Sequence, residues 1–84
     1  TYSGNANFWL GFIYQTRGDL SASEKAFKEV LTFPNHNKQE DAKYNLGKVY
    51  HLQGKTEEAR SLLTEVAAGS SNTASLAKAY LATM

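Results

Sequence analysis

The sequence contains no cysteine, only one proline and no long apolar run. Without cysteine the chain has no disulfides, no thiolate ligands for a metal and no cysteine nucleophile. No run approaches the roughly 20 apolar residues that a membrane-spanning helix needs, so we expect no membrane insertion. Nine Lys and Arg residues balance eight Asp and Glu residues, and no basic block stands out. Nucleic acid is therefore not an expected partner.

The length of 84 residues predicts a single small domain over residues 1–84. A chain this short buries only about 60% of its unfolded surface, so each large apolar side chain matters for the core. Aromatic residues make up 12% of the sequence, which favours a packed core over disorder.

An internal repeat organises the chain, because a set of residues recurs 36 positions later. The first set is Leu10, Gly11, Tyr14, Gly18, Leu20, Phe27 and Val30. The second set is Leu46, Gly47, Tyr50, Gly54, Thr56, Leu63 and Val66. We expect two helix-turn-helix units, about residues 3–34 and 37–69, followed by a capping helix at about residues 72–83.

In unit one, helical spacing predicts a buried stripe on the first helix formed by Ala6, Trp9, Leu10, Ile13 and Tyr14. Gly18 should end that helix. Ser21 and Glu24 have the spacing of a capping box for the second helix. The buried stripe expected on that helix is Leu20, Ser23, Phe27, Val30 and Leu31, and Pro34 should prevent its continuation.

Unit two has the same organisation. Asn37 and Glu40 form the expected capping box, and the first buried stripe is Ala42, Leu46, Val49 and Tyr50. Gly54 should stop this helix, Thr56 should cap the next, and Gly69 should terminate it. The second stripe is Ala59, Leu62, Leu63 and Val66, with Glu57 and Glu58 favourably placed in the first turn. Residues 76–80 of the last helix echo residues 46–50.

Gly11 and Gly47 lie in the middle of predicted helices, where glycine costs about 1 kcal/mol relative to alanine. That cost is explained if a neighbouring helix approaches closely there, with Phe27 or Leu63 packed over the gap. We therefore expect stacked antiparallel helix pairs.

The pattern Leu-Gly-x-x-Tyr-x-x-x-Gly, with a large apolar residue nine positions later, resembles the tetratricopeptide repeat. Leu10, Gly11, Tyr14, Gly18 and Phe27 carry the resemblance in unit one, and Leu46, Gly47, Tyr50, Gly54, Ala59 and Leu63 carry it in unit two. Departures are Ser23 in place of an alanine, the missing second proline, and a period of 36 rather than about 34 residues. The resemblance implies an all-α solenoid, a short right-handed superhelix that binds protein and is not an enzyme.

Residues 5–11, 41–47 and the terminal Ala77, Leu81 and Met84 also resemble a subgroup of these repeats. The subgroup is the C-terminal domain of the Tol-Pal-associated periplasmic coordinator of cell-envelope constriction. This resemblance implies a periplasmic protein in cell division; without it, the cytoplasm is the expected compartment.

In this fold the first helices of successive units line a concave groove, and the stripe beside each core stripe should face it. The resulting candidate partner-binding residues are Asn5, Phe8, Phe12, Gln15, Tyr44, Asn45, Lys48 and His51. Asp41, Ala74, Lys78 and Leu81 occupy similar places. The expected partner is a protein or peptide.

Phe8 and Phe12 attract attention because the predicted core stripe leaves them exposed. Three explanations are open: contact with a partner in the groove, packing against an upstream unit, or a seam between copies of the chain. The last makes homo-oligomerisation the alternative function. Phe8 and Phe12 also stand where the chaperone-binding repeats have a lysine and an asparagine, so Asn45 alone does not make a carboxylate clamp.

The residues available for catalysis or metal binding are few. His36 and Glu40 are spaced as a ligand pair, but His51 belongs to another element and no third ligand is evident. Glu57 and Glu58 point to different sides of a helix, Ser70 and Ser71 form no nucleophile elbow, and the glycines form no phosphate loop. We expect no enzyme activity, no metal and no cofactor.

Overall fold

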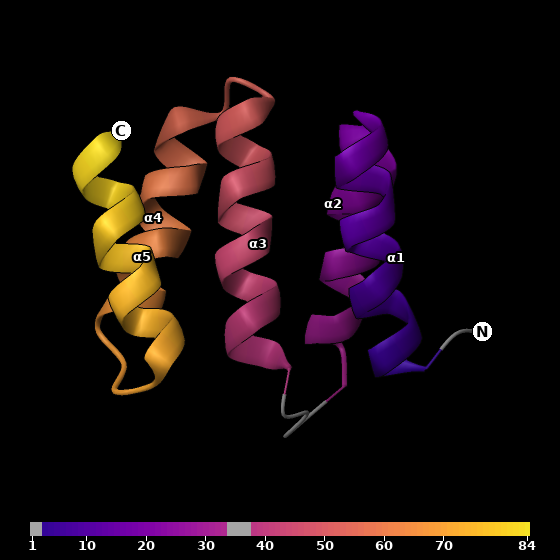
Figure 1. Cartoon of the computed structure of the whole chain (residues 1–84), viewed down its shortest axis with the longest axis horizontal. Helices are drawn as coiled ribbons and strands as arrows, with labels where there is room; N and C mark the ends of the chain where they lie inside the picture. The colour runs from indigo at the N-terminus through magenta and orange to yellow at the C-terminus, as the bar shows by residue number, and fades with distance from the viewer. Residues whose placement is uncertain (1–2, 34–37) are drawn as a thin grey trace.

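The computed structural model describes residues 3–33 and 38–84, and these residues form five α-helices in an all-α solenoid (Figure 1). The helices are α1 (Gly4–Arg17), α2 (Leu20–Leu31), α3 (Gln39–Leu52), α4 (Thr56–Ala67) and α5 (Asn72–Thr83). Figure 1 shows α1, α3 and α5 in a front layer, with α2 and α4 behind them. Each helix packs against the next along the chain, and α3 also contacts α5.

Two glycines shape the turns within the units. Gly18 follows α1 with a φ of 82°, and Gly54 follows α3 with a φ of 84°. Glycine adopts this left-handed conformation without the steric cost that a Cβ imposes. The prediction that both glycines end a first helix is confirmed. Gly69 differs, because α4 already ends at Ala67 and the backbone of Gly69 is not left-handed.

The caps of the second helices differ from the prediction. Asp19, not Ser21, precedes α2, and its carboxylate accepts a hydrogen bond of 3.3 Å from the Ala22 amide. Thr56 is the first residue of α4, so Lys55 holds the cap position without a side-chain bond. The cap therefore lies two residues before the predicted Ser21 in α2 and one residue before the predicted Thr56 in α4.

Pro34 and Asn37 lie outside the described residues, so their predicted roles in stopping and capping helices stay predictions. Glu57 and Glu58 lie in the first turn of α4 as expected, where the helix dipole favours negative charge.

Each mid-helix glycine marks a close approach, as predicted. A Cβ built on Gly11 would lie 2.6 Å from the ring of Phe27, and one on Gly47 would lie 2.7 Å from Cγ of Leu63. In unit one the buried Ser23 hydroxyl also donates a 2.7 Å hydrogen bond to the Gly11 carbonyl. The missing side chains therefore let α2 and α4 pack directly on α1 and α3.

Two hydrophobic clusters form the core. The first joins Phe8, Phe27 and Val30 of unit one to Ala42, Leu46 and Val49 of α3. The second joins Leu63 and Val66 of α4 to Ala77 of α5, with Leu81 and Met84 packed against it. The stripes predicted for α2, α3 and α4 are confirmed, because every residue in them is fully or partly buried.

The stripe predicted for α1 is wrong as a core face. Trp9 is 57% exposed and Ile13 is 47% exposed, whereas Phe8 is only 4% exposed. Phe8 and Phe12 make edge contacts with Phe27, at centroid distances of 6.0 and 5.7 Å. Helical periodicity identified an apolar stripe, but it did not identify the neighbour against which each side of the helix packs.

The register of α5 also differs from the prediction. Ala77, Leu81 and Met84 meet Leu63 and Val66 in the second cluster. Ala42, Leu46 and Val49, each 35 residues earlier, share the first cluster with Phe27 and Val30. Ala77 is therefore equivalent to Ala42, and the sequence echo that aligned it with Gly47 does not describe the packing.

Candidate partner-binding face

Three of the predicted binding residues meet on the α3–α5 side of the front layer. Tyr44, Lys48 and His51 lie on successive turns of α3, and Tyr80 of α5 completes the group. His51 Nδ1 lies 2.8 Å from the Tyr80 hydroxyl oxygen, and the two rings are 5.6 Å apart between centroids. We call these four residues the Tyr80 cluster.

Aromatic rings surround the cation of the Tyr80 cluster. Lys48 Nζ lies 5.4 Å from the centroid of Tyr44 and 6.0 Å from that of Tyr80. The two rings meet edge to face at 6.3 Å. Cation–π attraction of this kind contributes about 0.5–1 kcal/mol at exposed sites, so it orients the ammonium group without neutralising its charge.

Partial burial affects the Tyr80 phenol. Removal from water raises its pKa above the usual value, and the proximity of Tyr44 raises it further. The hydroxyl therefore stays protonated across the physiological range and remains a hydrogen-bonding group beside His51. A partner would meet an apolar aromatic surface with an ammonium group and an imidazole along one side.

Asn45 and Asp41 have structural roles beside this cluster. Asn45 is only 5% exposed, and its Nδ2 donates a 2.8 Å hydrogen bond to the Asp41 carbonyl. The Asp41 carboxylate accepts a hydrogen bond from the Thr73 hydroxyl, which ties the start of α5 to α3. The expectation that Asn45 lies open on the face is therefore wrong, because its amide is used within α3.

The residues predicted on α1 do not join the cluster. Phe8 is buried in the core rather than exposed, and Phe12 is partly buried against the same rings. Asn5 is exposed near the start of α1, and Gln15 is partly buried near its end. Partner binding by these four residues stays a prediction, but Phe8 presents almost no surface for it.

The sequence did not identify Tyr80 as a candidate binding residue. The similarity of residues 76–80 to residues 46–50 aligned Tyr80 with Tyr50, which was predicted to lie in the core. The closing-helix residues predicted instead were Ala74, Lys78 and Leu81; Ala74 is buried, Leu81 packs on the second core cluster and Lys78 is exposed. The packing of Ala77, Leu81 and Met84 corresponds to that of Ala42, Leu46 and Val49, 35 residues earlier, so Tyr80 is equivalent to Asn45 and not to Tyr50.

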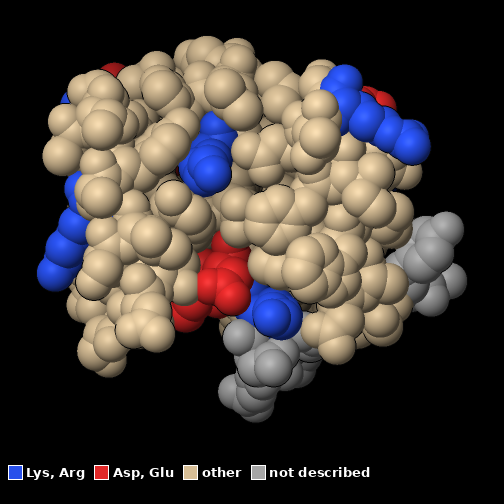
Figure 2. Space-filling model, viewed as in Figure 1, with Lys and Arg blue, Asp and Glu red and all other residues tan. Residues whose placement is uncertain are grey.

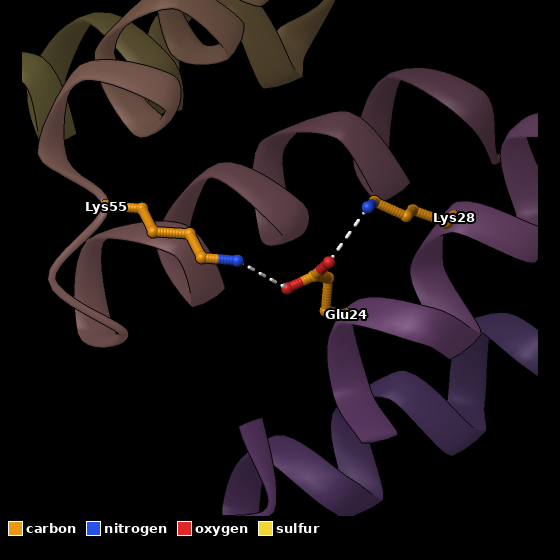
Figure 3. Close-up of polar contacts among 3 residues, drawn as sticks. All are labelled: Glu24, Lys28 and Lys55. Carbon is orange, nitrogen blue, oxygen red and sulfur yellow. Dashed lines mark hydrogen bonds and ion pairs between the residues drawn. The ribbon is translucent and has the colours of Figure 1, made fainter. Parts of the chain in front are cut away.

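A separate polar network connects the two units (Figure 3). The Glu24 carboxylate of α2 lies 2.8 Å from Lys28 Nζ and 3.3 Å from Lys55 Nζ. Both ammonium groups lie over the ring of Tyr50, at 5.8 and 5.4 Å from its centroid. The hydrogen bond from Lys28 holds the pKa of Glu24 below its usual value. These contacts fasten α2 to the α3–α4 turn, which is a structural role.

The front layer carries few charges overall. Figure 2 shows mostly uncharged residues on the face seen in Figure 1, with one isolated basic group and, below it, an acidic patch that has a second basic group beside it; further basic groups lie at the edges. Among residues 3–33 and 38–84, no three His, Asp or Glu side chains are grouped as metal ligands. His36 lies outside those residues. Within the same ranges, no helix is both long and apolar enough to cross a membrane.

Comparison with known proteins assigns the repeats. A family model described as tetratricopeptide repeat matches residues 4–37, and a second model with the same description matches residues 41–68. The chain belongs to the tetratricopeptide repeat family. A search of curated proteins found no match. Tetratricopeptide repeats generally mediate protein–protein interactions, and the two matched segments correspond to the helix pairs α1–α2 and α3–α4.

Proposed function

We propose that this tetratricopeptide repeat protein is an adaptor that binds a partner protein or peptide on the α3–α5 face. The single observation that carries the proposal is the Tyr80 cluster, in which a lysine and a histidine lie beside two tyrosine rings. Tyrosine is one of the residue types enriched among those that dominate binding energy at interfaces.

The chemistry of the cluster suggests what the partner presents. Lys48 has no carboxylate within salt-bridge distance among the described residues, so its charge is available to an acidic group. Tyr44 and Tyr80 provide apolar surface beside it. We infer that the partner segment carries an acidic side chain next to an apolar one, in an extended or helical conformation.

The test is quantitative capture of partners from the source cells with the wild-type protein and with Lys48→Glu. We expect the variant to lose most of the captured partner while its free energy of unfolding falls by only about 1–2 kcal/mol, through loss of the two cation–π contacts of the half-buried Lys48. Arg60→Glu is the matched control, because it reverses an exposed charge on α4, away from the cluster. Equal losses with both variants would mean that binding follows net charge and not this face.

Homo-oligomerisation through Phe8 and Phe12 is the alternative function. The proposed contact between copies needs both phenylalanine rings on the surface. Phe8 is only 4% exposed, which removes the main argument for that contact. Light scattering over a concentration series tests it directly, since a monomer at high concentration would exclude the oligomer.

A role in bacterial envelope organisation with the Tol-Pal system stays a prediction, based on the resemblance of residues 5–11 and 41–47. It is tested by fractionating source cells and by asking whether Tol-Pal proteins are captured by the wild type and lost with Lys48→Glu. Recovery of the protein in the cytoplasm would exclude the periplasmic role.

A further inference from the structure

A hydrogen bond joins His51 of α3 to Tyr80 of α5 within the Tyr80 cluster. His51 Nδ1 and the Tyr80 hydroxyl oxygen are 2.8 Å apart, and the planes of the two rings meet at 86°. One of these groups donates and the other accepts. A neutral imidazole has one N–H and one bare nitrogen, so the direction of the bond depends on which nitrogen carries the proton.

The chemistry of the two groups decides this direction while His51 is neutral. The Tyr80 phenol keeps its proton, because burial and the proximity of Tyr44 raise its pKa. A phenol O–H is a better donor than an imidazole N–H, and a bare imidazole nitrogen is a better acceptor than a phenol oxygen. The hydroxyl therefore donates to Nδ1, and the single imidazole proton lies on Nε2.

Protonation of His51 reverses this bond. Its side chain is only partly buried, so protons from solvent reach the ring. An imidazolium carries a proton on both nitrogens, so Nδ1 becomes the donor and the Tyr80 oxygen the acceptor. The phenol proton then turns away from His51 and is free to donate to a group outside the pair.

The charged groups around His51 do not offset the charge that protonation adds. Lys48 lies three residues earlier on α3 and its Nζ is 6.0 Å from the Tyr80 ring, so it faces the same side. Lys78 is the only charged residue of α5 and lies two positions before Tyr80, about 200° around the helix. Among the described residues, the ion-paired carboxylates of α2 and α4 bind lysines, and no carboxylate lies within salt-bridge distance of His51. Protonation therefore places two cations side by side, and an approaching anion relieves their repulsion.

We propose that the His51–Tyr80 pair makes partner binding at the Tyr80 cluster proton-linked, so that an acidic segment binds more tightly when His51 is protonated. This inference rests on the proposed function and names its regulation. The imidazolium attracts the partner's carboxylate beside Lys48, and the released Tyr80 O–H donates a hydrogen bond to it. Histidine is the side chain that ordinarily changes charge between pH 5 and 8, so the response falls in that range.

The first test locates the proton in the protein alone. Long-range ¹H–¹⁵N spectra distinguish a protonated imidazole nitrogen from a bare one, and His51→Gln identifies the His51 signals, since the chain has two histidines. We expect the proton on Nε2 at pH 8 and on both nitrogens at pH 5.5. The proposal fails if Nδ1 carries the proton at pH 8, because the Tyr80 oxygen would already accept. It also fails if His51 is still neutral at pH 5.5.

The second test measures binding of a defined probe, the capped dipeptide acetyl-Asp-Leu-amide, with acetyl-Asn-Leu-amide as its uncharged control. The probe carboxylate is ionised at both pH values. Chemical-shift titration should give a dissociation constant about fivefold lower at pH 5.5 than at pH 8. His51→Gln should remove this difference, whereas His36→Gln, at the other histidine of the chain, should keep it. Circular dichroism at both pH values checks that each variant is folded.

Tyr80→Phe separates the reversed hydrogen bond from the added charge, because it keeps the ring and removes only the hydroxyl. We expect it to weaken probe binding at pH 5.5 and to change it little at pH 8, where the hydroxyl is engaged with His51. Equal losses at both pH values would overturn the reversal.

The outcomes also separate this inference from the proposed function. Probe binding that Lys48→Glu removes, but that is equally tight at pH 5.5 and pH 8, would support the acidic partner and overturn the proton linkage. If the aspartate probe gave no saturable shift at either pH, the partner chemistry on which both proposals depend would be wrong.

Discussion

α1 and α3 begin the two units and derive from one repeated pattern, yet they bury different residues. On α3, Leu46 and Val49 are buried against α2, while Tyr44 and Lys48 lie on the partly exposed α3–α5 side. On α1 the equivalent of Val49, Ile13, is exposed, and Phe8 is in the core. The difference shows that neighbours, and not the helical pattern alone, decide which apolar face becomes core.

The positions that face the next unit have also been used differently. Phe8 and Phe12 are 36 residues before Tyr44 and Lys48. In unit one these positions are aromatic and belong to the core cluster with α3. In unit two they carry a phenol and an ammonium group beside α5. Equivalent positions of the repeat therefore pack against the next unit in unit one and form part of the candidate binding face in unit two.

The largest expected effect comes from filling the close approaches within the units. Gly11→Leu and Gly47→Leu should each destabilise the protein by about 3 kcal/mol or more, because overpacking a core contact displaces its neighbours. Gly11→Ala and Gly47→Ala should also destabilise the protein, since the added Cβ would lie less than 3.0 Å from the fully buried side chain of Phe27 or Leu63. Chemical denaturation of the four variants measures this, and unchanged stability of either Leu variant would mean that the helices do not approach closely there.

Removal of Phe8 should have the next largest effect. We expect Phe8→Ala to lower the free energy of unfolding by about 3–5 kcal/mol, as for other buried phenylalanines. Tyr44→Ala, at the equivalent position, should cost about 1 kcal/mol because the side chain is partly exposed. Thermal and urea unfolding provide the measurement. If Phe8→Ala had native stability, Phe8 would not be part of the core, and the hypothesis that Phe8 binds a partner in the groove would again apply.

The Glu24 network should have an intermediate effect that depends on pH. The pKa of the Glu24 carboxyl group is lowered in the folded protein. Its ion pairs therefore stabilise the fold above the unfolded pKa of about 4.5, and this stabilisation is lost as the pH falls through the lower pKa of the folded state. We expect Glu24→Gln to cost about 1 kcal/mol at pH 7, with the difference from wild type shrinking below pH 4.5. Arg60→Gln is the control, since Arg60 is the exposed equivalent in unit two. If the difference in free energy of unfolding between wild type and Glu24→Gln did not depend on pH, packing and not charge would explain the lower stability of the variant.

The repeat, the helices and the glycine contacts could be predicted because they depend on local patterns. Gly18 and Gly54 end first helices by their backbone freedom, and Gly11 and Gly47 are small where second helices approach. The burial of Phe8 could not be predicted in this way, because it depends on which helix lies beside α1.

The candidate site could be predicted for one helix only. Tyr44, Lys48 and His51 follow from the spacing on α3, and the structure brings them together. Tyr80 could not be placed, because the echo of residues 46–50 aligned it with Tyr50 at a spacing of 30 residues, whereas the packing of α5 corresponds to a spacing of 35. This difference of five residues rotates the assigned helical face by about 140°, so Tyr80 was assigned to a core position.

The smallest expected effect is the sharpest test of the comparison between α1 and α3. Ile13→Ala should change the free energy of unfolding by about 0.5 kcal/mol or less, because the side chain is 47% exposed and alanine is the better helix former. Val49→Ala should cost about 2 kcal/mol, since it removes methyl groups from a fully buried position. Urea unfolding at low protein concentration gives both values. Equal losses would mean that the stripe on α1 is covered in solution, and measuring Ile13→Ala over a concentration series identifies the cause. A cost that grows with concentration assigns the cover to a second copy, whereas a constant cost assigns it to the chain's own residues.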